Sequence, residues 1–332
     1  MMKISSTRLA LTFVAGFIFI FIMIPVTLVT FATPHTEQIH KEEIIPQEEM
    51  LQQEQQQEPE NDFYITVYRS ELSEFQEIEF ERYLVGVVAA EMPALFELDA
   101  LRAQAIAART YAMRILEHED FISDTVTHQV FLDEDQLKVR WGDAFELYFG
   151  IIEEAVKSTQ GIVLIYDGEL ITPMFFAMSS GATENSEDVF STARPYLRSV
   201  ESRGYDDHDN FAVEVGFAIE DLRVAFEDAE ITTENIIILQ TSEGGNVSQI
   251  QIGNEIFSGR DVREILGLYS AAFRIDTVEG GIIFTTYGNG HGVGMSQRGA
   301  NVMAQNGFDY TEILQHYYQN VTLEEKSFTN DE

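Results

Sequence analysis

The sequence predicts an α+β protein of helices and antiparallel strands, with one main domain, a smaller inserted α+β domain and a single N-terminal transmembrane helix. Three observations predict this architecture. Residues 10–33 are apolar and uncharged, residues 98–116 repeat apolar side chains at helical spacing, and residues 161–178 have the pattern of a β-hairpin. Helical segments and hairpins that follow one another in a chain are typical of the α+β class.

The uncharged run at residues 10–33 exceeds the ~20 residues that a helix needs to cross a bilayer. Lys3 and Arg8 precede it and Glu and Gln follow, so the positive-inside rule places residues 1–9 in the cytoplasm and the C-terminal domain outside. The alternative is a signal peptide cleaved near Ala32. The run is longer than the apolar core of a signal peptide, which favours an uncleaved, single-pass anchor in the cell membrane.

Residues 34–61 are rich in Glu and Gln and have too few apolar side chains for a core, so we expect a linker. The chain has 56 acidic and 20 basic residues and a formal net charge of -36. This charge argues against nucleic acid as a partner, because phosphate binding requires a basic surface. The absence of cysteine excludes disulfides, thiolate metal ligands and cysteine nucleophiles.

The local patterns predict a series of elements beyond the linker. Alternating side chains at 63–69 predict a strand, residues 79–90 are compatible with a helix that runs into Glu91, and Asp99 is a candidate cap for a helix ending at Leu116. Further segments are expected as a helix at 144–159, a hairpin turning at Asp167-Gly168, strands at 211–217, 235–241 and 247–252, and helices at 218–226 and 259–268.

The domain boundaries follow from where the polar motifs stop and resume. We expect residues 62–206 and 279–325 to form the main domain, residues 207–278 the inserted domain, and residues 326–332 a tail.

The C-terminal segment predicts a strand, a glycine-rich loop and a helix. The loop has Gly at positions 288, 290, 292 and 294, Ser296 can cap the helix, and Gly307 can end it. We expect a pocket with free backbone N–H groups there, from which His291 projects. The loop lacks the Lys-Ser/Thr pair of a phosphate-binding loop.

Glu91 is the one carboxylate between an apolar run and Met92-Pro93. Loss of hydration raises the pKa of a carboxyl group, and a carboxylic acid that keeps its proton near neutral pH can act as a general acid. The alternative is a structural Glu at a helix end, paired with an arginine. Arg102 and Arg109 share a helix face seven residues apart and are expected to reach Glu91 or a substrate; beside Glu91 they would lower its pKa.

The remaining polar residues permit structural as well as functional interpretations. His128 lies in the strand-like segment THQVF, where a lone His is more often structural. A zinc site of His128 and His291 is conceivable, but neither a close His pair nor an HExxH motif supports it, and we expect no metal. Ser179-Ser180-Gly181 lacks the GxSxG pattern of a nucleophile. The polar loop at 183–187 is either a solvated turn or the lining of a cleft.

Six segments in fixed order resemble the Stage II sporulation protein D family, and the resemblance extends from about Tyr83 to Val321. The single N-terminal anchor also fits that family. The segments are AAEMPALFELDALRAQAIAARTYA, THQVF, SSGATENSEDVF, PYLRSVES, SGRDVREILGL and GHGVGMSQRGA.

The resemblance implies a membrane-anchored lytic transglycosylase, a peptidoglycan lyase that acts in engulfment during sporulation. Such enzymes cleave the bond between N-acetylmuramic acid (MurNAc) and N-acetylglucosamine (GlcNAc) without water and leave a 1,6-anhydroMurNAc end. The Glu of the family's EMP motif falls on Glu91, which the resemblance makes the acid and then the base. The implied substrate is glycan stripped of stem peptides, the implied partners are a sporulation amidase and a further membrane protein, and no cofactor is implied.

The resemblance also assigns motif residues to a substrate cleft. The family often has Lys where this chain has Arg102, so the charge is kept. A non-catalytic peptidoglycan-binding scaffold that recruits or stimulates an amidase is the alternative function, and a metal-dependent hydrolase is a third. The residues assigned to the cleft are Arg102, Arg109, His128, Glu184, Ser186, Tyr196, His291 and Gln297.

Overall fold

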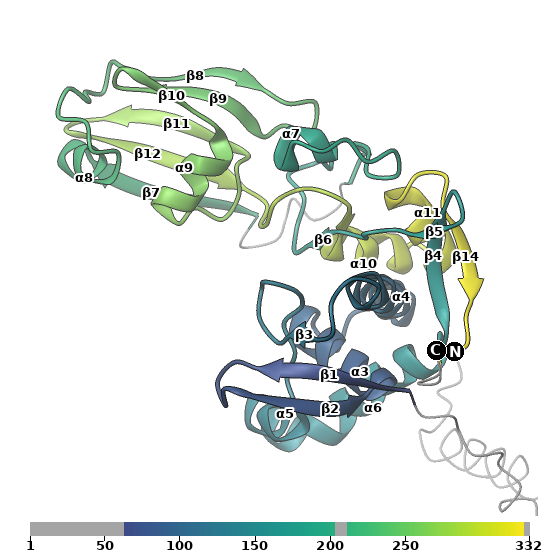
Figure 1. The fold of residues 1–332 in the computed structure, drawn as a ribbon. Coiled ribbons are helices and arrows are strands. Elements are labelled where there is room, and N and C mark those ends of the chain that lie inside the picture. Colours follow the sequence, from purple (N-terminus) through teal and green to yellow (C-terminus); the bar gives the residue numbers. More distant parts are fainter. Residues whose placement is uncertain (1–62, 203–210, 329–332) are drawn as a thin grey trace, which may run out of the picture. The chain divides into compact units, whose positions relative to one another are not determined.

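The computed structural model describes residues 63–202 and 211–328, which belong to one compact unit, Asn61–Glu332 (Figure 1). The membrane anchor expected at 10–33 and the linker expected at 34–61 lie outside the described residues. Within the described ranges, no helix has the length and apolar character needed to cross a membrane. The described residues form mixed helices and sheets, as the sequence predicts.

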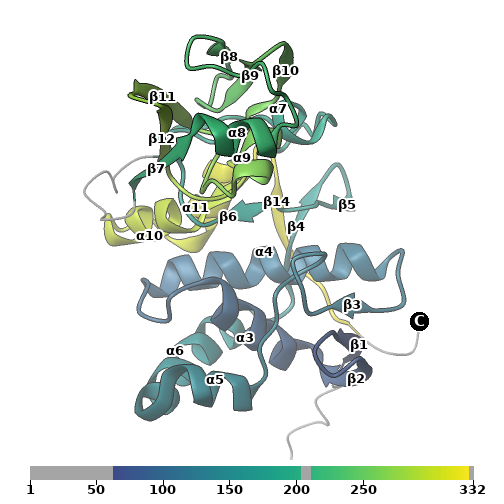
Figure 2. The same cartoon turned by 90° about the vertical axis from the view of Figure 1, so that its left-hand side faces the viewer.

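Helix α4, Leu98–Leu116, is the centre of the larger core. It contacts α3 (Phe80–Glu91), α6 (Phe145–Lys157), α10 (Gln297–Gln305) and α11 (Tyr310–Tyr317). Figure 2 shows α4 between α3 and α6 on one side and α10 on the other. Alanine makes this possible, because a helix with short side chains allows close approach on several faces; six alanines of α4 are buried, at positions 100, 103, 105, 107, 108 and 112.

Short sheets surround these helices. One has the order β2-β1-β3, from β1 (Tyr64–Arg69), β2 (Glu74–Glu79) and β3 (Ile122–Ser123). Another has the order β14-β4-β5, from β4 (Ile162–Tyr166), β5 (Glu169–Leu170) and β14 (Thr322–Glu325). The remaining elements are β6 (Phe175–Phe176), β13 (Met295–Ser296), α5 (Glu134–Trp141), the 3-10 helix η1 (Gly142–Ala144) and α7 (Ser186–Phe190).

The structure confirms the turn of the predicted hairpin and shortens its strands. Asp167 and Gly168 have φ angles of 52° and 83° between β4 and β5, the left-handed conformation of a tight hairpin turn. The chain then leaves the hairpin, and β6 pairs in parallel with β13. The β1–β3 pair is also parallel, so the strands are not all antiparallel as expected.

The second part of the fold has its own core between two antiparallel sheets. One sheet has the order β10-β9-β8 and the other β11-β12-β7, with apolar side chains such as Ile250, Val262 and Phe284 between them. Its elements are β7 (Ala212–Ala218), α8 (Ile219–Ala225), β8 (Ile236–Thr241), β9 (Val247–Ile252), β10 (Glu255–Phe257), α9 (Gly259–Leu266), β11 (Phe273–Val278) and β12 (Gly281–Tyr287).

The expected inserted domain, 207–278, stays a prediction, and the structure adds a detail about its end. Strand β12 pairs with β7 from Gly281 to Tyr287 and with β11 on its other side. Residues 281–287 therefore share a sheet with the inserted segment, and the expected boundary falls in the turn between two paired strands.

Two predicted helix caps have different outcomes. Helix α4 begins at Leu98 with Glu97 as its N-cap, so Asp99 lies in the first turn and the expected cap at Asp99 is wrong. Asp99 still favours the helix, because its charge lies near the positive end of the helix dipole. Ser296 caps α10 as predicted, since its side chain accepts a hydrogen bond from the Gly299 N–H.

A buried ion pair joins α4 to three neighbouring elements. The Arg109 guanidinium is fully buried and donates to both carboxylate oxygens of Glu81 on α3, at 2.9 and 2.6 Å. It also donates to the backbone carbonyls of Val156 on α6 and Ile162 on β4, each at 3.2 Å. Removing one member of such a pair leaves the other charge buried without compensation.

We therefore expect Arg109→Met to lower the free energy of unfolding by about 3–5 kcal/mol, the range for breaking a buried ion pair. Urea unfolding followed by circular dichroism measures this loss. Arg274→Met is the matched control, because Arg274 is 60% exposed and pairs with the equally exposed Asp276; it should change stability by less than about 0.5 kcal/mol. Equal effects of the two substitutions would contradict the structural role of Arg109.

Candidate active site

Glu91 is the last residue of α3, and the local sequence explains why the helix ends there. Met92 is extended, with φ -122° and ψ 147°, and its N–H still donates to the Val88 carbonyl at 2.9 Å. Pro93 follows, and a residue before proline disfavours helical conformation. The carboxyl group of Glu91 therefore lies at the carbonyl end of a helix, where the helix dipole does not stabilise negative charge.

The surroundings of Glu91 favour its protonated form. The side chain is half-buried, and burial is the largest influence and raises its pKa. A hydrogen bond from the Gln297 amide acts in the opposite direction, but its length is 3.4 Å. Among the described residues, no Lys, Arg or His forms an ion pair with Glu91, so the expected arginine partner is not found there.

Gln297 is the site residue predicted from sequence that the fold brings to Glu91. It is the first residue of α10, and its Nε2 lies 3.4 Å from both Glu91 Oε2 and Gln104 Oε1. Gln104 is completely buried on α4. Both acceptors are oxygens, so Gln104 holds the Gln297 amide with its NH₂ group toward the carboxylate.

Three buried polar residues are not predicted from the sequence: Gln104, Gln129 and Tyr83. The Tyr83 hydroxyl donates to Gln129 Oε1 at 3.3 Å, and Gln129 Nε2 donates to the Ala108 carbonyl at 3.3 Å. Burial raises the pKa of Tyr83 far above its usual value, and the charge of Glu91 contributes to the rise. A signal was available for Gln104: it is the one neutral polar side chain in the alanine-rich segment LRAQAIAA.

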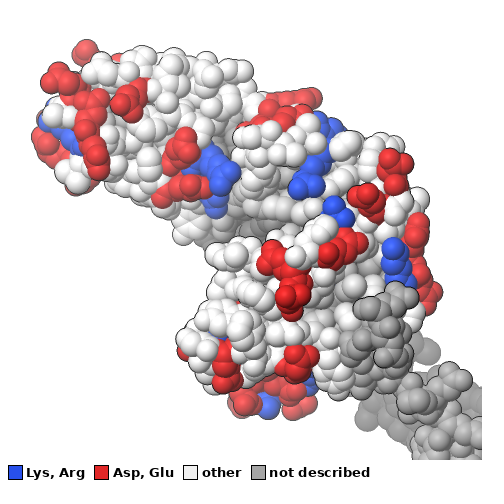
Figure 3. Space-filling view, viewed as in Figure 1, with Lys and Arg blue, Asp and Glu red and all other residues white. Residues whose placement is uncertain are grey.

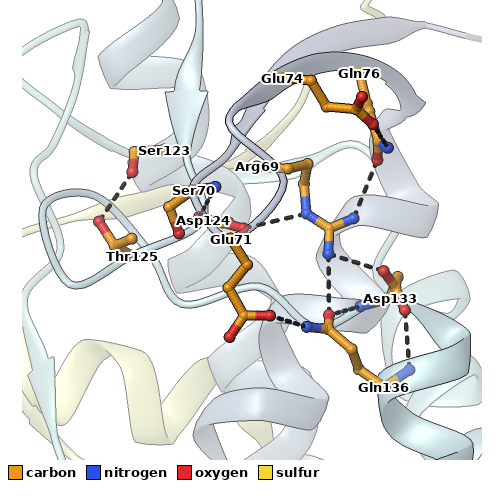
Figure 4. Close-up of polar contacts among 10 residues, drawn as sticks. All are labelled: Arg69, Ser70, Glu71, Glu74, Gln76, Ser123, Asp124, Thr125, Asp133 and Gln136. Atoms are coloured by element: carbon orange, nitrogen blue, oxygen red, sulfur yellow. Dashed lines mark hydrogen bonds and ion pairs between the residues drawn. The ribbon is translucent and has the colours of Figure 1, made fainter.

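A network around Arg69 holds the loop that carries Gln129. Arg69 is 4% exposed; its guanidinium contacts Asp124 at 3.2 Å and Asp133 at 2.8 Å, at the two ends of this loop (Figure 4). Gln76 on β2 and Gln136 on α5 accept two further hydrogen bonds, at 3.1 and 3.0 Å. The loop at 124–132 contains no strand, so the strand-like character expected for THQVF is wrong.

Neither of the two α4 arginines predicted for the cleft bonds to Glu91. The guanidinium of Arg109 is buried and occupied by Glu81 and two carbonyls, so it cannot contact a substrate, and we remove it from the cleft assignment. Arg102 bonds to Ser158 at 3.0 Å and Asp99 at 3.4 Å. It is two residues from Gln104, and two residues turn a helix by about 200°, so Arg102 faces away from the Gln104 side.

Three other predicted cleft residues bond to their local surroundings. His128 accepts from the Ser123 N–H at 2.9 Å and lies 3.5 Å from Glu119. The buried Ser186 hydroxyl accepts from the Arg194 N–H at 2.8 Å. The Tyr196 hydroxyl accepts from the Thr172 N–H at 3.1 Å and from Arg194 at 3.1 Å. Through these contacts the three side chains stabilise the loops around them.

The expected pocket of free N–H groups is not found at His291, and both of its ring nitrogens bond to backbone groups. Its Nδ1 accepts from the Val293 N–H at 3.0 Å, and Nε2 lies 3.0 Å from the Phe175 carbonyl, so Nε2 carries the proton. Burial lowers its pKa to about 4 and keeps the ring neutral. Neither nitrogen is available as a metal ligand. Nearby loop N–H groups also have protein acceptors: Asn289 donates to Met178, Gly290 to Tyr269 and Met295 to Met174.

Glu184 is a second buried carboxyl group, at 1% exposure. Its Oε1 accepts from the Ser242 hydroxyl at 2.8 Å and the Asn246 N–H at 2.9 Å, while Oε2 has no partner among the described residues. Burial raises its pKa, and the two hydrogen bonds oppose that rise. These contacts tie residues 183–185 to the β8–β9 turn. Within the described part of the chain, no group of three or more His, Asp or Glu side chains is placed to hold a metal ion.

Comparison with known proteins points to one family. The sequence model described as "SpoIID: Stage II sporulation protein" matches residues 68–166. Stage II sporulation protein D of Bacillus amyloliquefaciens is 38% identical over 271 residues, 79% of this chain and 78% of that protein. Its counterpart in Bacillus subtilis (strain 168) is 37% identical over 271 residues, 79% of each chain. A protein named amidase enhancer in the same strain is 26% identical over 295 residues, 72% of this chain and 40% of that protein.

The Gln297–Glu91 contact predicts a change in acidity. Gln297→Met keeps an unbranched side chain but removes the amide donor, so the Glu91 pKa should rise further above its ordinary value. Carboxyl ¹³C titration by nuclear magnetic resonance measures this, with the Glu91 signal assigned by its absence from Glu91→Gln. Glu312→Gln is the control, since it removes an exposed carboxylate that caps α11, and it should leave the Glu91 pKa unchanged.

The raised pKa of Glu91 should also make the fold less stable at neutral pH than at acidic pH. Because the pKa of Glu91 is raised in the folded state, the folded protein releases this proton less readily than the unfolded chain does. The free energy of unfolding therefore falls as the pH rises from the unfolded-state pKa to the folded-state pKa, and it does not recover at higher pH. We expect Glu91→Gln to be more stable than the wild type at pH 7 and equal to it at pH 3. Urea unfolding at the two pH values tests this, and a destabilised variant at pH 7 would contradict it.

Proposed function

We propose, on the basis that this chain belongs to the Stage II sporulation protein D family, that it is a lytic transglycosylase of peptidoglycan with Glu91 as its proton donor and acceptor. The observation that carries the proposal is the state of Glu91. Burial raises its pKa, and its one described hydrogen-bond partner is the neutral amide of Gln297. A carboxyl group in this state can hold a proton and release it to a leaving oxygen.

The reaction proposed for Glu91 returns its proton at the end. Protonated Glu91 donates to the glycosidic oxygen, and the bond between MurNAc C1 and that oxygen breaks with the electron pair leaving on GlcNAc O4. The Glu91 carboxylate then accepts the proton of the MurNAc 6-hydroxyl. The hydroxyl oxygen forms a bond to C1 and closes the 1,6-anhydro ring, so no water is consumed.

The proposed chemistry needs one carboxylate rather than two. A hydrolase of the usual kind uses a second Asp or Glu as nucleophile or base, within about 5–10 Å of the first. An intramolecular hydroxyl nucleophile needs no such partner.

The family and its relatives suggest the wider setting of this proposal. Sporulation is the process named in two similar proteins, and we propose engulfment as the stage, peptide-stripped glycan as the substrate and the cell membrane as the location. We further propose that a sporulation amidase and another membrane protein are partners. An amidase would supply the substrate, because it removes the stem peptides that block access to the glycan.

The end groups of the digestion products test the proposed chemistry. Purified full-length protein incubated with peptide-stripped glycan should release fragments with 1,6-anhydroMurNAc ends, detected by mass spectrometry. Glu91→Gln keeps the size of the side chain and removes the acid, and it should lower the rate by about 10²–10⁴-fold, the usual contribution of general acid–base catalysis.

Glu97→Gln is the matched control for this experiment. Glu97 is an exposed carboxylate six residues further along the same segment, and its substitution should leave the rate within about twofold of the wild type. Fragments with hydrolysed reducing ends would instead indicate a water-using glycosidase, and loss of activity with a chelator would indicate a metal-dependent hydrolase.

The similarity to an amidase enhancer favours one alternative, a non-catalytic scaffold that binds peptidoglycan and stimulates an amidase. The same substitution separates the two functions. A scaffold with Glu91→Gln would still bind glycan and stimulate the amidase fully, and the wild-type protein would release no anhydro ends.

A further inference from the structure

A cavity lies between the part built on α4 and the part built on the β7–β12 sheets. Its volume is about 810 Å³, within the range of small-molecule sites. Val126 lines it from the loop after β3, Phe190 and His291 line it from the main domain, and Arg260 and Arg263 line it from α9. Figure 3 shows the surface hollowed here, with basic side chains over α9 at its edge.

Arg263 has unused hydrogen-bonding capacity in this cavity. The side chain is half-buried, and its Nε donates to the Tyr269 carbonyl at 3.3 Å. Its two terminal nitrogens have no hydrogen-bond partner, and no carboxylate lies within 4.0 Å of them, in the ranges 63–202 and 211–328. Burial is the largest influence on the guanidinium and lowers its pKa, while the charge of nearby Glu264 acts in the opposite direction.

The other charged groups of the cavity already have partners. Arg260 forms an ion pair with Glu264 at 2.9 Å and donates to the Val189 carbonyl at 3.1 Å. The three carboxylates at the cavity are likewise engaged: Glu264 with Arg260, Asp261 with the N–H and hydroxyl of Ser258, and Asp188 with the side chain of Asn185. His291 is neutral and does not compete for an anion. Arg263 thus lines the cavity with two terminal nitrogens that have no partner in the described part of the chain.

We propose that Arg263 binds the lactyl carboxylate of a muramic acid residue, in a subsite of the glycan that the cavity accommodates. This inference rests on the proposed function. Each muramic acid of a peptide-stripped strand has a free lactyl carboxylate, whereas a stem peptide converts that group into a neutral amide. A guanidinium binds a carboxylate through two parallel N–H···O bonds, which an amide cannot reproduce.

Two further features fit an anionic sugar ligand. The protein has a net charge of -36 and repels a polyanionic strand, so a free cation in a cavity offsets this repulsion at one point. The same cavity holds the ring of Phe190, with the Arg260 guanidinium 5.6 Å from its centroid. An aromatic ring supplies the apolar surface against which a sugar ring packs. Arg263 therefore recognises strands from which the peptide has already been removed.

Binding of two glycans by a catalytically blocked protein tests the assignment. Full-length Glu91→Gln and the double variant Glu91→Gln/Arg263→Gln are titrated calorimetrically with peptide-stripped glycan and with chito-oligosaccharides of the same length, which lack the lactyl group. Arg263→Gln should weaken binding of the stripped glycan about tenfold, the effect of one charge-assisted contact, and leave chito-oligosaccharide binding unchanged. Converting the lactyl carboxylates to methylamides should weaken binding to Glu91→Gln by the same factor and have no further effect on the double variant.

Two controls complete the design. Arg274→Gln in the same background removes an exposed arginine paired with Asp276 outside the cavity, so it reports the effect of net charge alone and should change neither affinity by more than about twofold. Thermal melting confirms that each variant is folded.

The outcomes separate this inference from the proposed function. Equal affinities with and without Arg263, equal losses for both glycans, or no binding of either glycan would overturn the role of Arg263. Absence of anhydro ends from wild-type digests would overturn the transglycosylase while leaving the binding result to decide the subsite.

Discussion

The buried guanidinium of Arg109 is the contact on which the arrangement of the larger core depends. It joins α4 to α3 through Glu81 and to α6 and β4 through two backbone carbonyls. A fully buried cation tolerates little displacement, because each lost hydrogen bond exposes an uncompensated charge to a low-dielectric interior. The pair therefore fixes where α3 crosses α4. Glu91 lies ten residues beyond Glu81 on the same helix, so the crossing also fixes the carboxyl group against Gln297.

A comparison of Glu91 with Glu184 shows that burial alone does not define a catalytic acid. Glu184 and Glu91 both have raised pKa values with desolvation as the largest cause. Glu184 is almost inaccessible and one of its oxygens bonds to Ser242 and Asn246, so it serves the junction between residues 183–185 and the β8–β9 turn. Glu91 is half-buried and has one long hydrogen bond from Gln297. A proton donor must be reached by its substrate, and Glu91 meets that condition.

Local sequence patterns predict most helices and strands, whereas the roles of most site residues depend on tertiary contacts. The hairpin turn, the Ser296 cap and the helices α3, α4, α6, α8, α9 and α10 depend on neighbouring residues, which the sequence displays directly. The isolation of Glu91 beside Met92-Pro93 was equally visible. In contrast, Gln297 lies 206 positions from Glu91, and the partner of Arg109 lies 28 positions away on a different helix. An arginine on an apolar helix looks the same in sequence whether it faces a cleft or a buried Glu, so the sequence does not show that Arg109 lies outside the cleft.

The glycine-rich loop shows how a motif can position a site residue without contacting a substrate. Gly294 has φ +80°, and a side chain there would collide with the Met174 carbonyl; at Gly292 a Cβ would lie 2.9 Å from Cγ of Glu184. These close approaches let β13 pair with β6, and the Met295 N–H then bonds to Met174 at 3.0 Å. Helix α10 begins two residues later at Gln297. The loop thus acts on Glu91 through backbone geometry, since any residue that displaces β13 also displaces the amide that contacts the carboxyl group.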